Sequence, residues 1–122
     1  MASLFKGRII MKKSFESQEK LLYLVEFGPV SEKVLEQQVV LDRLETILYE
    51  WAQTAGLEID SCDVLPDYVA MTFYVKPLVD IDDAIVALKK YSNDALLKEF
   101  SNFQQFVVEG SLWEDGYDVE LL

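Results

Sequence analysis

Short apolar runs and amphipathic stretches alternate along the chain, and their spacing predicts the order of the elements. Residues 21–27 form an apolar and aromatic run that Gly28 and Pro29 end, which predicts a β-strand. Ser31 is a candidate N-cap for a following helix, and Gly56 stands where the cap at its other end is expected. Between them, apolar residues recur every three to four positions, as on the buried side of an amphipathic helix. These residues are Val34, Val40 or Leu41, Leu44, Ile47 or Leu48, Trp51 and Ala55.

The second half of the chain repeats this scheme. Residues 57–64 predict a strand and residues 65–67 a turn, and apolar residues then alternate from Val69 to Val75, as in a strand with two distinct faces. Asp80 is a candidate N-cap of a second helix. We expect its buried side to carry Ile85, Leu88 and then Ala95 or Leu96. The aromatic tail predicts turns and a last strand, which gives the order β-α-β-β-α-β and an α+β fold of the ferredoxin-like kind, with two helices on one face of an antiparallel sheet.

Length and charge divide the chain into two unequal parts. Its 122 residues suffice for one domain. Residues 1–20 hold five basic and two acidic residues, whereas residues 21–122 hold six basic and 20 acidic residues. We therefore expect a basic N-terminal arm at 1–20 and a single acidic domain at 21–122. A body of this charge disfavours nucleic acid as the main partner, because phosphates must be neutralised by bases.

Two features of the composition exclude whole classes of chemistry. The chain has no histidine, which removes Ser-His-Asp triads, Cys-His nucleophiles and imidazole-ligated metals. Cys62 is the single cysteine, so an intramolecular disulfide is excluded and a reducing compartment is favoured. No apolar run approaches the ~20 residues that a membrane span needs. The composition thus predicts a cytoplasmic protein without a membrane segment, a metal or a cofactor.

Other groupings of residues allow more than one interpretation. Asp60, Asp63 and Asp67 suggest a carboxylate site for Mg²⁺, but on an ideal strand the first two point to opposite faces, and surface or turn carboxylates are favoured. Tyr68, Phe73 and Tyr74 are compatible with an aromatic platform for nucleic-acid bases. The glycine and basic residues that accompany such platforms are missing, so packing between strands or a dimer contact is favoured.

Four strings in order resemble the single-tyrosine HUH transposases, which cut and rejoin single-stranded DNA. Residues 65–73, Leu-Pro-Asp-Tyr-Val-Ala-Met-Thr-Phe, are similar to that family's signature strand, which reads roughly Met-Pro-Asp-His-hydrophobic-His-hydrophobic. Residues 55–59 resemble the end of the preceding helix, and residues 88–100 resemble the second helix. Residues 110–119 resemble the tail strand, in which Leu-Trp, Gly-Tyr and Val recur at this spacing. The resemblance covers about residues 20–120 and implies the same ferredoxin-like fold.

The departures from the family pattern bear on catalysis. The two metal-binding histidines of the family fall at Tyr68 and Ala70, and without its metal the leaving group has no Lewis acid. The family's nucleophilic tyrosine lies on a helix beyond the tail strand, whereas this sequence ends at Leu122. Tyr117 matches the structural Gly-Tyr of the tail and is not the nucleophile. The resemblance therefore implies a protein that is not an enzyme.

The expected partners follow from the charge distribution and from this resemblance. The bases available to contact nucleic acid are Lys6, Arg8, Lys12, Lys13, Lys89, Lys90 and Lys98. Because family members are dimers whose sheets join along an edge, a homodimer is expected, with Trp113 and Tyr117 as candidate contacts. The leading hypothesis is a catalytically inactive, dimeric regulatory module that binds a protein, as an inhibitor or dominant-negative partner of a transposase or other nucleic-acid-binding protein. The alternative is a residual binder of single-stranded or hairpin DNA or RNA.

Overall fold

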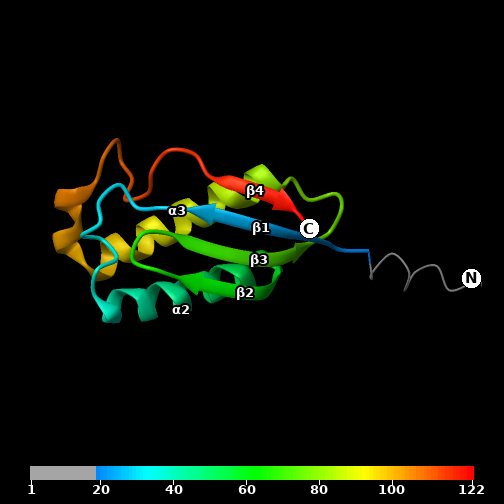
Figure 1. Cartoon of the computed structure of the whole chain (residues 1–122), viewed down its shortest axis with the longest axis horizontal. Coiled ribbons are helices and arrows are strands. Elements are labelled where there is room, and N and C mark those ends of the chain that lie inside the picture. Colours follow the sequence, from blue (N-terminus) through cyan, green and yellow to red (C-terminus); the bar gives the residue numbers. More distant parts are fainter. Residues whose placement is uncertain (1–18) are drawn as a thin grey trace, which may run out of the picture.

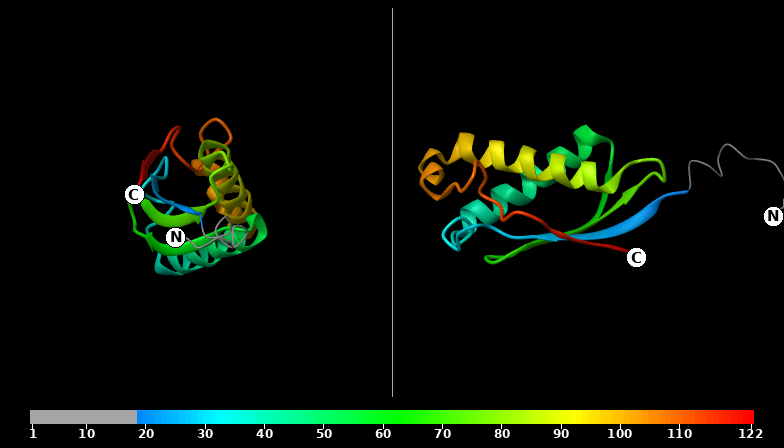
Figure 2. Two further views of the ribbon diagram at one scale, coloured as in Figure 1. Left: turned by 90° about the vertical axis from the view of Figure 1, so that its right-hand side faces the viewer. Right: turned by 90° about the horizontal axis from the view of Figure 1, so that it is seen from above.

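The structure, a computed structural model, describes residues 19–122 and consists of a four-stranded antiparallel sheet with two long helices on one face (Figures 1 and 2). The strands are β1 (Leu21–Phe27), β2 (Glu58–Val64), β3 (Val69–Val75) and β4 (Asp118–Leu121), and their order in the sheet is β2-β3-β1-β4. The helices are α2 (Gln38–Ala55) and α3 (Ile81–Glu99), and a short 3-10 helix, η1 (Ser101–Phe106), follows α3. The predicted β-α-β-β-α-β order and fold class are confirmed. The arm expected at residues 1–20 lies almost wholly outside the described residues.

Alternation along β3 separates the two faces of the sheet. Val69, Met71, Phe73 and Val75 are buried under the helices, whereas Ala70, Thr72 and Tyr74 lie on the other face and are half-buried. β1 pairs with β3 without interruption from Leu21 opposite Val75 to Phe27 opposite Val69. β2 pairs with the other edge of β3 and carries an irregularity between Ile59 and Ser61. The face of the sheet away from the helices is called the open face below.

α2 supplies much of the core but begins later than its sequence pattern predicts. The helix starts at Gln38, and its N-cap is Gln37, whose side chain makes no capping hydrogen bond. The prediction that Ser31 is the N-cap is wrong: the Ser31 hydroxyl accepts from the backbone N–H of Lys33 at 3.2 Å, and this bond belongs to a local turn. Val34 is fully buried in this loop, which is why it extended the apparent helical stripe. Gly56 closes the helix in the left-handed conformation, as predicted.

α3 begins as predicted and carries an unexpected polar pair on its buried side. The Asp80 carboxylate accepts from the backbone N–H groups of Asp82 and Asp83, which satisfies the first turn. Ile85, Leu88 and Leu96 are buried as expected, but so are Ser92 and Asn93. Asn93 accepts a hydrogen bond at 2.9 Å from the backbone N–H of Leu112, so α3 holds the tail as well as the sheet.

The tail after η1 is anchored in the core through Trp113. Its side chain is 2% exposed, and its ring packs edge-on against Phe27 with ring centroids 4.9 Å apart. Trp113 therefore has no surface with which to contact a second chain, and the prediction that it is a dimer contact is wrong. An apolar residue in the tail can pack either against a second chain or against the core of its own fold. In this structure Trp113 does the second. Neither α2 nor α3 contains an apolar stretch long enough to cross a bilayer.

Candidate acidic site on the open face of the sheet

The pairing of the four strands places carboxylates in a row across one end of the open face. Glu26 on β1 lies opposite Ala70 on β3 and opposite Asp118 on β4, and Asp63 on β2 is the other partner of Ala70. Because directly paired residues point to the same side of a sheet, Asp63, Glu26 and Asp118 share the open face. The small side chain of Ala70 leaves the middle of this row without a polar group of its own.

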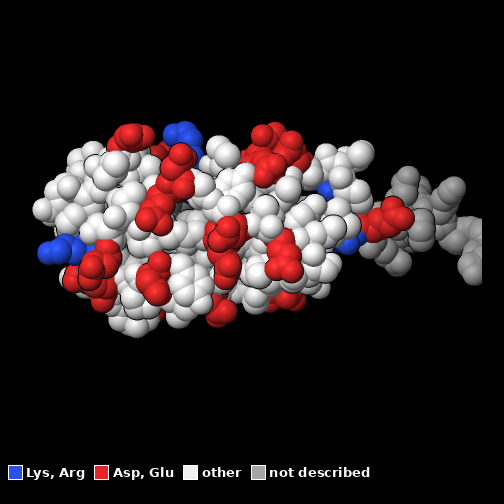
Figure 3. All heavy atoms as spheres, turned by 45° about the horizontal axis from the view of Figure 1, so that its top comes forward, with Lys and Arg blue, Asp and Glu red and all other residues white. Residues whose placement is uncertain are grey.

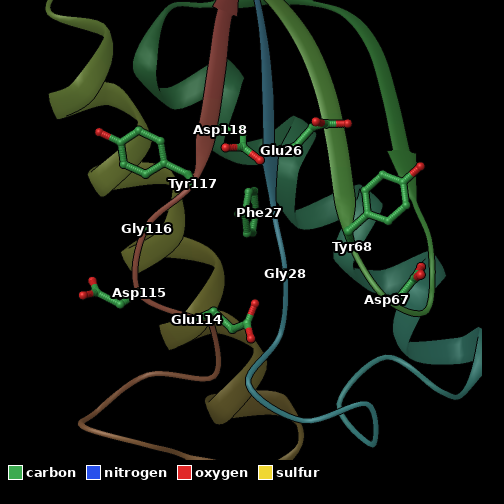
Figure 4. Close-up of a pocket in the computed structure, with 10 residues that line it drawn as sticks. All are labelled: Glu26, Phe27, Gly28, Asp67, Tyr68, Glu114, Asp115, Gly116, Tyr117 and Asp118. Atoms are coloured by element: carbon green, nitrogen blue, oxygen red, sulfur yellow. The ribbon is translucent and has the colours of Figure 1, made fainter.

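A hollow of about 440 Å³ lies at this end of the sheet (Figure 4). Figure 4 shows Glu26 and Asp118 on adjacent strands at one side of it, Tyr68 and Asp67 on the β2–β3 hairpin, and Tyr117 turned away towards α3. The lining is completed by the end of β1 and the tail, and comprises Glu26, Phe27, Gly28, Asp67, Tyr68, Glu114, Asp115, Gly116, Tyr117 and Asp118. Five of these residues are carboxylates and none is basic, so the hollow favours a positively charged occupant.

Backbone pairing fixes the wall formed by the tail. The backbone N–H of Glu114 donates to the Gly28 carbonyl at 2.9 Å, and that of Val30 donates to the Leu112 carbonyl at 2.8 Å. A side chain at Gly28 would meet the Asp67 carbonyl oxygen at 3.2 Å, so glycine allows the hairpin and the tail to approach β1 closely. The tail is thus fixed by hydrogen bonds and the β2–β3 hairpin by close contact with Gly28, although both walls lie outside the strands of the sheet.

Lys89 fixes the same wall from the side of α3. Its ammonium group donates to the carbonyls of Glu114 and Gly116, each at 2.8 Å, and lies 5.7 Å from the centre of the Tyr117 ring. Burial lowers the pKa of Lys89, partly offset by the charge of Asp115. The Tyr117 hydroxyl donates to Asp82 on α3, and this hydrogen bond raises the pKa of the phenol. Lys89 thus holds the tail, and Tyr117 remains only a candidate dimer contact.

The remaining predicted bases lie apart from the hollow or outside the described residues. Lys90 is exposed and pairs with Asp94 one turn later on α3 at 3.0 Å, and Lys98 is exposed near the end of the same helix. Lys6, Arg8, Lys12 and Lys13 fall within residues 1–18, which lie outside the described part of the chain. Within residues 19–122, Lys89 and Lys90 line one small hollow together with Asn93 and Asp94, and Lys98 is not part of it.

Tyr68 and Ala70, which the resemblance assigns to the positions of the family's metal ligands, do not fit a divalent metal. Tyr68 is 38% exposed at the rim of the hollow, and Ala70 offers only a methyl group to the open face. A neutral phenol and a methyl group are a poor donor set for a divalent ion, although Glu26 and Asp63 lie opposite Ala70 on its two neighbouring strands. Among residues 19–122, no group of three or more Asp, Glu or Cys side chains lies close enough together to hold one. Asp60 instead accepts from the Thr72 hydroxyl at 2.9 Å.

Cys62 lies on the opposite side of the sheet from this site. It pairs with Met71, whose side chain faces the helices. Burial, together with the charges of Glu45 and Asp63, raises the pKa of the thiol to about 12. The thiolate is the reactive form of cysteine, so Cys62 is part of the packing and is not a nucleophile.

Sequence reasoning missed the residues that hold the site together. Asn93 and Ser92 bind the tail from α3, yet both appear in the sequence only as polar interruptions of an apolar stripe. That interruption is the available signal, because a serine at a position where the helical period requires an apolar residue indicates a buried hydrogen bond. Glu26 gives no signal in the sequence, since the hollow joins segments almost 90 residues apart.

Comparison with known proteins agrees with the fold. The family model described as "Transposase IS200 like" matches residues 23–121. The ISDra2 transposase TnpA of Deinococcus radiodurans is 31% identical over 78 residues, which are 64% of this chain. The chain spans only 56% of the length of that relative.

Two solved structures share the architecture. A Deinococcus radiodurans protein assigned as a transposase superposes with a TM-score of 0.77 at 29% identity, over 96% of this chain and 85% of its own. A REP-associated tyrosine transposase bound to a REP hairpin has a TM-score of 0.58 at 10% identity, over 84% of this chain and 56% of its own. At that identity the second likeness concerns the fold alone.

Proposed function

Because the chain belongs to the IS200-like transposase family, we propose that it is a member that does not cut DNA and acts instead as a regulatory binding module. One observation carries the proposal: Tyr68 and Ala70 stand at the positions of the family's metal-binding histidines, in a chain without any histidine. A scissile phosphate needs a Lewis acid or strong hydrogen-bond donors to stabilise the charge that develops on it. Around these two positions the open face carries carboxylates, which are neither Lewis acids nor hydrogen-bond donors.

The same charge favours a protein partner over nucleic acid. Glu26, Asp118 and Glu114 surround the hollow, and a DNA phosphate entering it would meet only like charge. Figure 3 shows acidic side chains spread over the β4 side of the molecule with few basic ones among them. A protein surface that binds phosphates is basic. The acidic hollow, whose lining also includes Phe27, Tyr68 and Tyr117, is complementary to such a surface. We therefore favour the basic groove of a transposase or other nucleic-acid-binding protein as the target.

A homodimer is the second part of the proposal. β4 is an edge strand of four exposed residues, and its outer N–H and C=O groups have no strand beside them in the described part of the chain. Val119 and Leu121 on this strand are 39% and 55% exposed. Pairing of two such edges across a two-fold axis would satisfy the backbone groups and cover these side chains.

The test is competition with an active member of the family. Increasing amounts of this protein are added to an IS200-like transposase and its labelled hairpin, and cleavage and DNA binding are measured together. We expect both to fall, and the double variant Glu26→Lys, Asp118→Lys to lose most of this inhibition. The variant Asp42→Lys, which makes the same charge change at one site on α2, serves as the control. Tight binding of the hairpin by this protein itself would favour the alternative, a residual binder of DNA or RNA.

A further inference from the structure

The open face changes in character from one end to the other. Its acidic end holds Glu26, Asp118 and the hollow, and none of the ion pairs within residues 19–122 involves Glu26, Glu114 or Asp118. Lys89 is the base beside this end, and its ammonium group is bonded to the backbone carbonyls of Glu114 and Gly116. The carboxylates of Glu26, Glu114 and Asp118 are therefore without an ion-pair partner within residues 19–122.

The other end of the open face carries leucines in its middle strand, with Glu120 opposite Leu24 on one side and Glu58 at the far edge. Leu22 lies opposite Tyr74, and Leu24 lies opposite Thr72, so both leucines point away from the helices. The backbone N–H of Leu122 donates to the Leu22 carbonyl at 2.9 Å, which brings a leucine with 59% of its surface exposed beside them. Figure 2 shows both long helices on one side of the sheet, and the pairing of Leu22 and Leu24 places these leucines on the other side.

Residues 1–18 have the complementary composition. They carry four bases, namely Lys6, Arg8, Lys12 and Lys13, against the single acid Glu16, which leaves a charge of +3 opposite a body of −14. They also carry seven large apolar residues, which are Met1, Leu4, Phe5, Ile9, Ile10, Met11 and Phe15. A segment that combines bases with large apolar side chains matches a face that combines carboxylates with leucines.

The point of attachment makes the contact accessible within one chain. The segment joins the sheet just before Leu21, at the end of the open face that carries Leu22. From there β1 runs roughly 23 Å to the acidic end, whereas 18 extended residues reach roughly 60 Å. A short tether also raises the effective concentration of the segment at the face to about the millimolar range, so that weak contacts suffice.

We propose that residues 1–18 dock on the open face of their own chain, with their apolar side chains on Leu22 and Leu24 and their bases over Glu26 and Asp118. A docked segment covers the surface that a basic partner would need, so such a partner must displace it. This regulatory consequence rests on the proposed function, whereas the docking itself does not.

The experiment uses the full-length chain with a nitroxide spin label on a single cysteine, in the variant Ser3→Cys, Cys62→Ala. Amide resonances are followed by NMR at low salt and at 0.5 M NaCl. We expect broadening of Leu24, Glu26 and Asp118 at low salt, and its loss at high salt. The variants Glu26→Lys, Asp118→Lys and Lys12→Glu, Lys13→Glu should each abolish the broadening, whereas Asp42→Lys on α2 should retain it.

Three results would overturn the proposal: no broadening on the open face, equal broadening on the outer surfaces of α2 and α3, or broadening unaffected by either charge reversal. A second sample mixes ¹⁵N-labelled protein that has no spin label with spin-labelled protein at natural isotope abundance. It tests whether the segment on the open face belongs to the same chain or to a second copy. The mixture is made in the Leu121→Lys background, which removes the dimer expected through β4, so that broadening in it means that the segment binds a second copy and contradicts docking within one chain. No partner is present in these samples, so failure here is separate from failure of the inhibition assay.

Discussion

The indole nitrogen of Trp113 donates to the hydroxyl of Ser92 at 3.0 Å, inside the core and 21 residues away along the chain. The Ser92 hydroxyl in turn donates to the Leu88 carbonyl of its own helix at 2.9 Å. Ser92 is completely buried and Trp113 nearly so. This chain of two hydrogen bonds joins the tail, which forms one wall of the acidic hollow, to α3.

Replacement of Ser92 by alanine should destabilise the fold. The variant Ser92→Ala leaves the buried indole N–H without an acceptor, and such an unsatisfied group costs about 1–3 kcal/mol. Urea denaturation followed by tryptophan fluorescence measures the change in the free energy of unfolding. The variant Ser101→Ala, at an exposed serine in η1, should stay within about 0.5 kcal/mol of the parent. Equal stabilities of the two variants would show that the hydrogen bond contributes nothing.

The strands and the order of elements could be predicted because local pattern and tertiary burial agree there. Residues 21–27 and 69–75 have the bounds that their apolar patterns predict, and Gly56 and Asp80 act as helix caps as expected. The start of α2 could not be predicted in this way. Val34 and Leu35 are buried in a loop, and burial of a loop residue looks like one more turn of an amphipathic helix.

The candidate site was much less predictable than the fold. Trp113 was expected on the surface because an aromatic residue in a tail gives no sign of which core accepts it. The hollow depends on the register of β1 with β4 and on the contact of Gly28 with the tail, both of which are long-range pairings. Of the residues that line it, the sequence singles out Asp67 and Tyr68 in the strand that resembles the family signature, and Tyr117 in the tail.

Cys62 should react slowly with alkylating agents. Its pKa of about 12 in the folded protein exceeds the ordinary value of 9.0, so very little thiolate exists at pH 8. We expect iodoacetamide to react at least about a hundredfold more slowly than with a free cysteine, and at the ordinary rate in 8 M urea. Since the folded pKa is raised, the stability it contributes is present below about pH 9 and is lost as the pH rises towards 12. Rapid alkylation of the native protein would contradict this burial.

The protein should form a homodimer through β4. Light scattering at micromolar concentration should report about twice the chain mass of 14.0 kDa. The variant Leu121→Lys places a charge on the edge strand and should shift the protein towards the monomer. The variant Leu78→Lys changes another exposed leucine, in the loop before α3, and should leave the dimer intact. A monomer at ~100 µM, or equal dissociation of both variants, would refute this interface.

The protein should neither nick DNA nor transfer strands. The positions of Tyr68 and Ala70 offer no imidazole, and the carboxylates around them repel a phosphate. Incubation with single-stranded hairpin DNA and Mg²⁺ or Mn²⁺ should give no cleavage and no covalent protein–DNA adduct. An active IS200-like transposase with its own hairpin serves as the positive control. An adduct on any tyrosine that forms only with metal would disprove the proposal of an inactive protein.

Nucleic-acid binding should be weak and should depend on the bases before β1. Contacts from Lys6, Arg8, Lys12 and Lys13 to a single strand predict a slope of about −3 for log K against log salt. Fluorescence anisotropy with a labelled hairpin, at low and at physiological salt, measures this slope. Deletion of residues 1–19 should abolish the remaining binding, because the body left behind is strongly acidic.

The opposite dependence is expected if α3 forms a nucleic-acid groove. Lys90 and Lys98 are its exposed bases, since Lys89 is bonded to the tail. In that case the double variant Lys90→Glu, Lys98→Glu should destroy binding, and deletion of residues 1–19 should leave it nearly unchanged. Lys90 already pairs with Asp94, so a groove on α3 would have to break this ion pair to hold a phosphate. Submicromolar affinity at physiological salt that survives the deletion would replace the protein-binding proposal with the nucleic-acid one.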